Sequence, residues 1–167
     1  EIADAQPGVG LVPRGVDQPL AIGRQHRTHR AALRVGHLRH VAGVAVVAMD
    51  LARKGAHVGL CYNRSQVEAE RTAAAVEHLG RRAFVKQADL TKASDCEAFV
   101  NETAATLGRV DVLINMASMY VSRPFSELTV QEFDDNIAVD VRSAFICSRA
   151  AWPHMRRSGG GHIINFS

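Results

Sequence analysis

Residues 110–118 read VDVLINMAS, and this stretch decides the fold class of the chain. It predicts a strand over Val110 to Asn115. The small residues Ala117 and Ser118 follow the end of this strand. A second strand is predicted near the end of the chain, over Ile163 to Phe166. The segment between them is long enough for a crossover helix, so we expect the two strands to pair in parallel.

The rest of the chain alternates helix-period and strand-period segments. Gly55, Gly80 and Gly108 stand where three of the helices are expected to stop. The predicted strands span 57–62 and 83–87, and the predicted helices span 45–54, 65–79, 94–107 and 130–157. This pattern predicts a three-layer, doubly wound (Rossmann-like) α/β fold around a mostly parallel sheet. A flavodoxin-like or receiver domain fits the same pattern, so function has to be argued from the sites.

Local patterns predict how the helices start and which faces they bury. A Ser or Thr followed three residues later by Glu predicts a capping box, in which side chain and backbone bond each other reciprocally. The predicted boxes begin at Ser65, Ser94 and Thr129. The spacing of apolar residues predicts the buried face of each helix. The predicted inward-facing residues are Val46, Val47 and Leu51; Ala69, Thr72, Val76 and Leu79; and Cys96, Phe99, Val100, Thr103 and Leu107.

Length and composition exclude several classes of protein. At 167 residues with 47% hydrophobic residues, the chain is long enough for a single domain with a real core. Its net charge of +3 comes from arginines spread along the chain, so nucleic acid is not an expected partner. Three widely spaced cysteines without a CxxC pair indicate neither a disulfide framework nor a zinc site, and they favour a reduced, cytoplasmic setting. No membrane span and no signal peptide are predicted.

A change of composition divides the chain near residue 40. No aromatic residue precedes Tyr62 and no lysine precedes Lys54, whereas the first 40 residues are rich in Arg, His, Gly and Pro. Because no amphipathic period survives there, we predict that residues 1–40 are irregular or disordered and that residues 41–167 form the domain. Two HxxH pairs lie in the first segment, but no carboxylate or cysteine completes a ligand set, so no metal site is predicted.

Six segments of residues 45–167 resemble, in order, motifs of the short-chain dehydrogenase/reductase family. They are AMDLARKGAHV, YNRS, ADL, VDVLINMAS, FDDNIAVDVRSAF and PHMRRSGGGHIINFS. The resemblance implies that residues 41–167 are a partial dinucleotide-binding Rossmann domain with an incomplete sheet, which holds a nicotinamide cofactor at the carboxyl ends of its strands. Intact members transfer hydride between the cofactor and a carbonyl or alcohol substrate. The chain thus resembles a fragment or degenerate member of an oxidoreductase family.

By this resemblance, Arg64 and Ser65 follow the strand whose end meets the adenosine ribose of the cofactor. An acidic residue there would bind the ribose hydroxyls of NAD(H), whereas Arg64 with the Ser65 hydroxyl would attract the 2′-phosphate of NADP(H). NADP(H) is therefore the predicted cofactor, and a solvated helix-start residue is the alternative role for Arg64. Asp89 and Leu90 match the turn that meets the adenine ring. A surface aspartate before a helix is the alternative for Asp89.

The end of the strand at 110–115 resembles the family's NNAG motif through Asn115, Ala117 and Ser118. Small side chains are needed there because the backbone passes close to a ribose of the cofactor. Met116 stands where the family has a second asparagine that ties strands together. We therefore expect weaker support of the sheet at this point.

The glycine-rich phosphate loop of the family, TGxxxGxG, is not matched. Its glycines bring backbone amides and a helix N-terminus to the diphosphate. Counting back from LARKGAHV places these glycines at Leu38, Ala42 and Val44, so NADP(H) binding is expected to be weakened or lost. Together with the change of composition, this leads to the hypothesis that residues before about 44 come from a shifted reading frame. A divergent N-terminus is the alternative.

The catalytic groups implied by the resemblance are incomplete as well. The family uses an asparagine, a serine and a YxxxK pair to move protons. Asp140 stands at the asparagine position, Ser167 is adjacent to the position of the missing serine, and the YxxxK pair would lie beyond it. The chain alone is therefore predicted to be inactive, and a non-catalytic nucleotide-binding or interaction module is the alternative. The resemblance also implies homo-oligomerisation through the helix at 130–157.

Overall fold

The structure is a computed structural model, and it describes residues 30–34, 41–119 and 124–166. The predictions for Leu38, for Ser167 and for the chain before Arg30 lie outside these ranges. Within them, no helix is long and apolar enough to cross a membrane.

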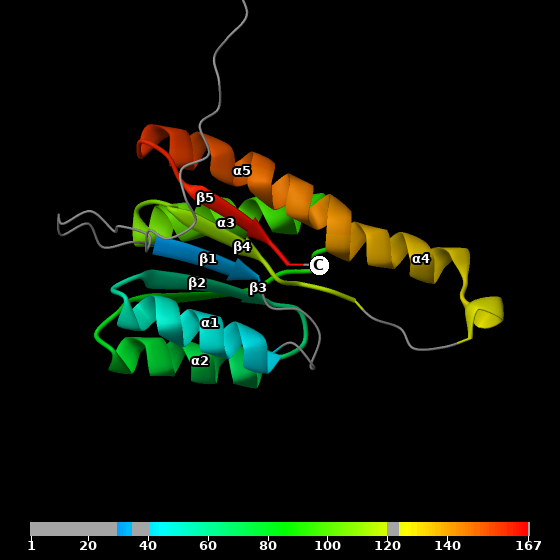
Figure 1. Cartoon of the computed structure of the whole chain (residues 1–167), viewed down its shortest axis with the longest axis horizontal. Helices are drawn as coiled ribbons and strands as arrows, with labels where there is room; N and C mark the ends of the chain where they lie inside the picture. Colours follow the sequence, from blue (N-terminus) through cyan, green and yellow to red (C-terminus); the bar gives the residue numbers. More distant parts are fainter. Residues whose placement is uncertain (1–29, 35–40, 120–123, 167) are drawn as a thin grey trace, which may run out of the picture.

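Five parallel strands form one sheet in the order β3-β2-β1-β4-β5 (Figure 1). They are β1 (Arg30–Arg34), β2 (His57–Tyr62), β3 (Ala83–Gln87), β4 (Val112–Asn115) and β5 (His162–Asn165). The parallel pairing confirms the predicted doubly wound α/β fold. The strand order reverses between β1 and β4, and in sheets of this kind ligands bind beyond the carboxyl ends of the strands at such a point.

Helices cover both faces of the sheet and complete the three layers. α1 and α2 pack on one face, while α3 and α5 pack on the other (Figure 1). α4 continues into α5 through a π-helix, η2, and it projects past the carboxyl edge of the sheet. The helices are α1 (Val41–Arg53), α2 (Gln66–His78), α3 (Ala93–Leu107), η1 (Phe125–Glu127, a 3-10 turn), α4 (Val130–Ile137), η2 (Ala138–Arg142) and α5 (Ser143–Arg157).

The central strand lies inside the segment that was predicted to be irregular. The expectation for residues 1–40 is wrong for Arg30–Arg34, which pair with β2 on one side and β4 on the other. Ala31 and Ala32 are 1% and 0% exposed, one in the core under α1 and the other in the core under α3. Because arginines flank only three apolar residues, the apolar run is too short to signal a strand in the sequence.

The buried face of α1 also differs from the prediction. The side chains that reach the core are at most 1% exposed: Val44, Ala48 and Ala52. Val46 is 67% exposed, so its inward assignment is wrong, whereas Val47 and Leu51 are half-buried. The small alanines face the sheet, and hydrophobicity alone favoured the larger valine beside them. Leu79 is exposed as well, because α2 ends before it.

One predicted capping box forms, and the other two do not. The Thr129 hydroxyl accepts the N–H of Glu132 at 3.2 Å, and the Glu132 carboxylate accepts the N–H of Thr129 at 2.9 Å. Ser65 has a ψ of 55°, outside the extended region that a capping residue adopts, and makes no such bond. α3 begins at Ala93, which places Ser94 inside the helix rather than before it.

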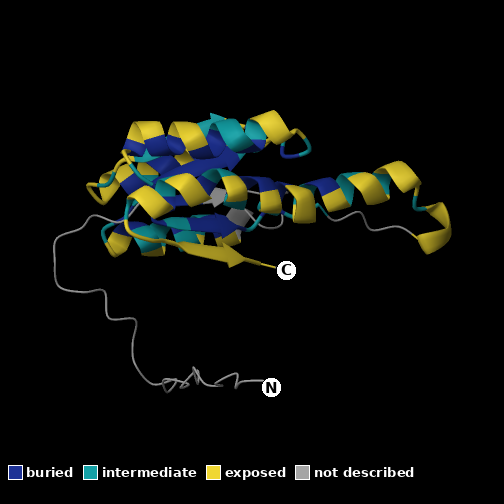
Figure 2. Ribbon diagram, turned by 90° about the horizontal axis from the view of Figure 1, so that it is seen from above, coloured by how far each residue is buried: buried dark blue, intermediate teal, exposed yellow. Residues whose placement is uncertain are grey.

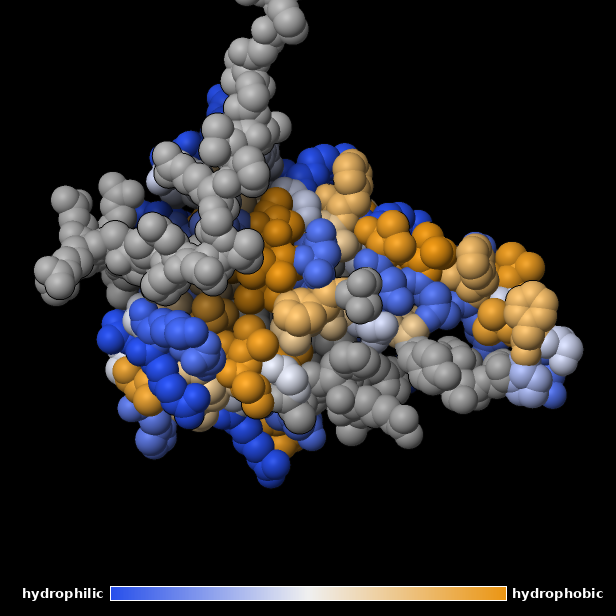
Figure 3. Space-filling model, in the orientation of Figure 1, coloured by the Kyte–Doolittle hydropathy of each residue, from blue (hydrophilic) through white to orange (hydrophobic). Residues whose placement is uncertain are grey.

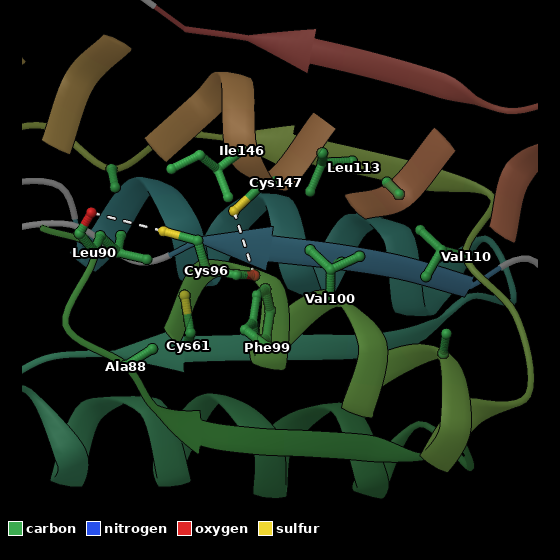
Figure 4. Close-up of a cluster of buried hydrophobic side chains, with 14 of the residues drawn as sticks. Cys61, Ala88, Leu90, Cys96, Phe99, Val100, Val110, Leu113, Ile146 and Cys147 are labelled. Atoms are coloured by element: carbon green, nitrogen blue, oxygen red, sulfur yellow. Dashed lines mark hydrogen bonds between the residues drawn. The ribbon is translucent and has the colours of Figure 1, made fainter. Parts of the chain in front are cut away.

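The core between α3, α5 and the sheet follows the prediction for α3. All five predicted residues, Cys96, Phe99, Val100, Thr103 and Leu107, are buried. Figure 4 shows the reduced thiols of Cys61, Cys96 and Cys147 in this core, where Sγ of Cys96 points to the Leu90 carbonyl at 3.6 Å. The cysteines thus serve as small apolar residues in the packing.

β5 forms one edge of the sheet and is exposed along its whole length (Figure 2). Its side chains alternate between the two faces of the sheet. Ile163 and Ile164 are consequently exposed on opposite faces, at 39% and 43%. An apolar strand at the edge of the sheet is therefore open to solvent on both faces.

Acid is expected to weaken the fold through His154 in the last turns of α5. Its Nδ1 accepts from Arg157 at 2.8 Å, and its Nε2 lies 2.7 Å from Oδ1 of Asn101 on α3. Partial burial, and then the positive charge of Arg157, hold the pKa of His154 below its ordinary 6.5. When the pH falls below about 6.5, the unfolded chain therefore takes up this proton before the folded protein does, and stability is lost. Urea unfolding at about pH 8 and pH 5.5 should show a smaller loss in His154→Gln than in the parent, and equal losses would contradict this role.

Candidate functional site

The predicted cofactor residues lie along one edge of the sheet. Because all five strands are parallel, their carboxyl ends meet at the same edge. Arg64 and Ser65 follow β2, Asp89 and Leu90 follow β3, and Asn115 ends β4. The fold therefore places all the predicted cofactor residues at this edge, in three successive loops.

At the end of β4, Asn115 ties two neighbouring strands together. Its side chain is 4% exposed and donates through Nδ2 to Oδ1 of Asn165 on β5, at 2.7 Å. Its backbone carbonyl accepts the N–H of Phe166 at 3.0 Å. The weaker sheet support expected from Met116 is thus offset at the adjacent residue. Met116 itself packs against the α1 side of the core, with its methyl group near Gly43 in the first turn of α1.

The chain leaving β4 is attached to the long helix by Asp140. The Asp140 carboxylate accepts the backbone N–H of Met119 at 2.9 Å and faces the hydroxyl of Ser118 at 3.4 Å. Ala117 is 8% exposed and belongs to the core under α3 and α5. The structure thus brings together Ser118 and Asp140, which are 22 positions apart in the sequence.

The turn after β3 is built around an ionised aspartate. Oδ1 of Asp89 accepts the hydroxyl of Thr91 at 2.7 Å and its N–H at 3.1 Å, and Lys92 lies 3.6 Å from Oδ2. These contacts, the Thr91 hydroxyl first, outweigh partial burial and lower the pKa of Asp89 below its ordinary 3.8. The backbone N–H of Asp89 donates to the Asp95 carboxylate at 2.9 Å. The turn is therefore ordered by its own residues.

The loop after β2 leaves one basic side chain available. The carbonyls of Tyr62 and Asn63 accept from Ala88 and from the Gln87 side chain, which joins this loop to the end of β3. Arg64 is exposed, and among the described residues none forms a hydrogen bond or ion pair with its guanidinium. Arg64 therefore faces solvent at the edge where the cofactor is predicted.

The positions of the missing phosphate loop are only partly described. Leu38 and the side chain of Ala42 lie outside the described part of the chain. Val44, at the third glycine position, is 1% exposed and packs in the core under α1. A side chain at this position is therefore accommodated by the helix packing. Gly43 is exposed, and a Cβ built there would lie 3.9 Å from the Met116 methyl group.

Three residues at this edge were not found by sequence reasoning: Thr91, Arg142 and Asn165. Arg142 and Asn165 act through contacts with residues about fifty positions away, which leave no local pattern. Thr91 follows Asp89 by two positions, and this spacing, typical of an Asx turn, is a local signal that could have found it. In the described part of the chain no three His, Cys, Asp or Glu side chains are grouped to hold a metal ion.

Comparison with known proteins gives a family match over most of the chain. The family model for the short chain dehydrogenase matches residues 43–167. A hydroxynaphthalene reductase from Aspergillus fumigatus is 31% identical over 123 residues, which cover 74% of this chain and 44% of the relative. A 3-oxoacyl-[acyl-carrier-protein] reductase from Staphylococcus aureus is 31% identical over 121 residues, covering 72% of this chain and 49% of the relative.

One solved structure of similar fold was determined with a bound cofactor. The short chain dehydrogenase from Burkholderia cenocepacia, determined in complex with NADP, superposes with a TM-score of 0.71 and 31% identity. The match covers 77% of this chain and 51% of that one. The chain thus spans about half the length of the relatives that it matches.

Proposed function

Because this chain belongs to the short-chain dehydrogenase family, we propose that the carboxyl edge of its sheet is a platform for a nicotinamide cofactor, with NADP(H) preferred over NAD(H). The observation that carries the proposal is the exposed guanidinium of Arg64, two residues after the end of β2, with which no described residue forms a hydrogen bond or ion pair. In a doubly wound sheet of this kind the end of that strand faces the adenosine ribose. A guanidinium there can donate two parallel hydrogen bonds to a 2′-phosphate.

Other groups at the edge fit the same cofactor. Asp89 is ionised and sits in an ordered turn, so its carboxylate can accept from the exocyclic amine of adenine. Ala117 has no side chain beyond Cβ, which lets a ribose approach the backbone next to Ser118. When bound, the cofactor supplies or accepts a hydride. The residues of this chain bind it and orient it.

The relatives are oxidoreductases, and we propose that this chain alone does not complete their reaction. In the described part of the chain the one tyrosine is Tyr62, and Gln66 stands four residues on, where a YxxxK pair would have lysine. Asp140, at the asparagine position, offers a carboxylate whose oxygens already face Ser118 and Met119. An ionised carboxylate accepts hydrogen bonds but donates none, so it cannot replace the amide as a donor.

Reversing the charge at Arg64 should change cofactor preference. The parent protein is expected to bind NADPH saturably and more tightly than NADH, although weakly, because the glycines of the phosphate loop are not matched. Arg64→Glu should weaken NADPH binding by about 10-fold or more, the effect of losing a charge-assisted hydrogen bond, and should leave NADH binding nearly unchanged. Isothermal titration measures both affinities. Arg71→Glu, at an exposed position of α2, is the matched control and should change neither.

Two results would contradict the proposal. If the parent did not bind NADPH at millimolar cofactor, the edge of the sheet would not be a cofactor platform. An equal loss of NADPH affinity in Arg64→Glu and Arg71→Glu would show that the effect comes from the net charge of the protein and not from the position of Arg64. Oxidation of NADPH by the parent chain with a carbonyl substrate would contradict the proposed inactivity.

A second proposal concerns a second copy of this chain as a partner. An apolar stripe runs along α4, η2 and α5 on the side away from the sheet, and Figure 3 shows apolar side chains gathered there. Six residues spaced mostly three or four positions apart form it, each 44% exposed or more: Val130, Phe133, Ile137, Val141, Phe145 and Trp152. Six large apolar residues on one continuous face are typical of a surface that binds another protein.

The charges beside the stripe favour an antiparallel second copy. The charged residues of α4 are all Asp or Glu. Those of α5 are arginines, and α5 contains no Asp or Glu. In an antiparallel pair the acidic half of each copy lies beside the basic half of the other. With Val141 at the two-fold axis, Ile137 would face Phe145 of the second copy, and Val130 would face its Trp152. We propose homo-oligomerisation through the 130–157 helix on this basis.

A further inference from the structure

The long helix contains one turn of π-helix, η2, at the point where it passes the carboxyl edge of the sheet. The backbone N–H of Ser143 bonds to the carbonyl of Ala138, five residues earlier. A π-turn inside an α-helix is rare and is frequently found at functional sites. Two oppositely charged residues of this turn, Asp140 and Arg142, reach loops on the edge of the sheet.

Asp140 contacts the loop that follows β4. One carboxylate oxygen accepts the backbone N–H of Met119 at 2.9 Å, and the other faces the Ser118 hydroxyl. Because Asp140 and Ser118 are exposed or half-buried, solvent competes for these bonds, so their contribution to the whole fold is small. Their effect on the order of this one loop is larger, since Ser118 and Met119 lie beyond the end of β4 and outside the strand pairing of the described residues.

Arg142 contacts the loop that follows β3. Its guanidinium donates to the backbone carbonyl of Thr91 at 2.9 Å. The N–H and hydroxyl of Thr91 bond in turn to Asp89, so Arg142 holds the turn that contains this carboxylate. β2 and β1 lie between β3 and β4 in the sheet, and no strand pairing connects the two loops. In the described part of the chain, η2 joins them.

We propose that η2 is a clamp, in which Asp140 and Arg142 are positioning residues that fix the two loops independently of each other. The consequence for ligands rests on the proposed function: Arg142 would set the adenosine end of the cofactor site through Asp89, and Asp140 would set the nicotinamide end through Ser118. Neither residue touches the cofactor in this proposal.

The clamp can be tested without any ligand, by amide hydrogen exchange. Asp140→Ala should speed exchange at Met119 about five-fold, and Arg142→Ala should do the same at Thr91 and Lys92, each leaving the other loop unchanged. Asp140→Asn should restore slow exchange at Met119, because the amide oxygen still accepts the N–H. Arg149→Ala is the matched control, since Arg149 lies on α5 and is paired with Glu97 away from both loops.

Two ligand probes then separate the clamp from the proposed function. Arg142→Ala should weaken 2′,5′-ADP and NADPH alike, whereas Asp140→Ala should weaken NADPH alone and Asp140→Asn should restore it. If the parent binds neither probe, the proposed function fails while the exchange data still test the clamp. Unchanged exchange in both loops, or faster exchange throughout the protein with a lower Tm, would overturn the clamp.

Discussion

Replacing Gly59 with alanine is expected to destabilise the protein by about 1–3 kcal/mol, the usual cost of adding a methyl group to a filled core. Gly59 lies in β2 directly beneath α3. A Cβ there would lie 2.7 Å from Cγ2 and 2.9 Å from Oγ1 of Thr103, too close for either atom. Thr103 is fully buried, and its hydroxyl donates to the Phe99 carbonyl at 2.7 Å. It can move aside only by breaking that bond or by pushing α3 away from the sheet.

A double substitution identifies the contact responsible. Thr103→Ala removes both clashing atoms, so Gly59→Ala should cost much less in the Thr103→Ala background than in the parent. Gly43→Ala is the control, because its Cβ would lie 3.9 Å from the Met116 methyl group, an ordinary contact distance, in an exposed helical turn. That change should be neutral or slightly stabilising. Urea denaturation measures all four variants, and additive costs would show that Thr103 is not the cause.

Val141→Arg is expected to weaken self-association by about 100-fold or more, because a charge placed at the two-fold axis would be buried against its own copy. The parent should sediment as a dimer, or a larger assembly, at micromolar concentration. The variant should sediment as a folded monomer with an unchanged circular dichroism spectrum, since Val141 is 59% exposed and contributes little to the core.

Val67→Arg provides the matched control for this effect. Val67 is 54% exposed on α2, on the other side of the sheet, so the same change there should leave the assembly intact. A parent protein that stays monomeric over the full concentration range would rule out the proposed interface. An equal shift in both variants would attribute the change to surface charge.

The fold was predictable wherever large apolar residues mark the core. α3 carries Cys96, Phe99 and Leu107 on one face, and all of its buried residues except Ala104 were predicted. α1 turns Ala48 to the sheet, and alanine gives too weak a signal to outweigh the nearby Val46. β1 was missed for the same reason, since its buried residues are alanines between arginines. Long-range pairing holds it in place, and no local pattern records that.

The location of the candidate site was predictable from the sequence, but the hydrogen bonds that order it were not. Parallel topology places Arg64, Asp89 and Ser118 at one edge, whatever their side chains do. Two of the contacts that order this edge join residues about fifty positions apart: Asn115 with Asn165 and Arg142 with Thr91. Whether a serine caps a helix is likewise decided by one backbone angle, as at Ser65.

The open edge of β5 has a consequence for the handling of the isolated chain. Natural sheets protect their outermost strands with charges, prolines or bulges, and the four residues His162–Asn165 include no proline and no Lys, Arg, Asp or Glu. The backbone groups on its outer side, which pair with no described strand, and its two isoleucines offer a template for any extended apolar chain. At high concentration we expect growth into larger particles to start there, so β5 sets the working range of concentration for every measurement on the isolated chain.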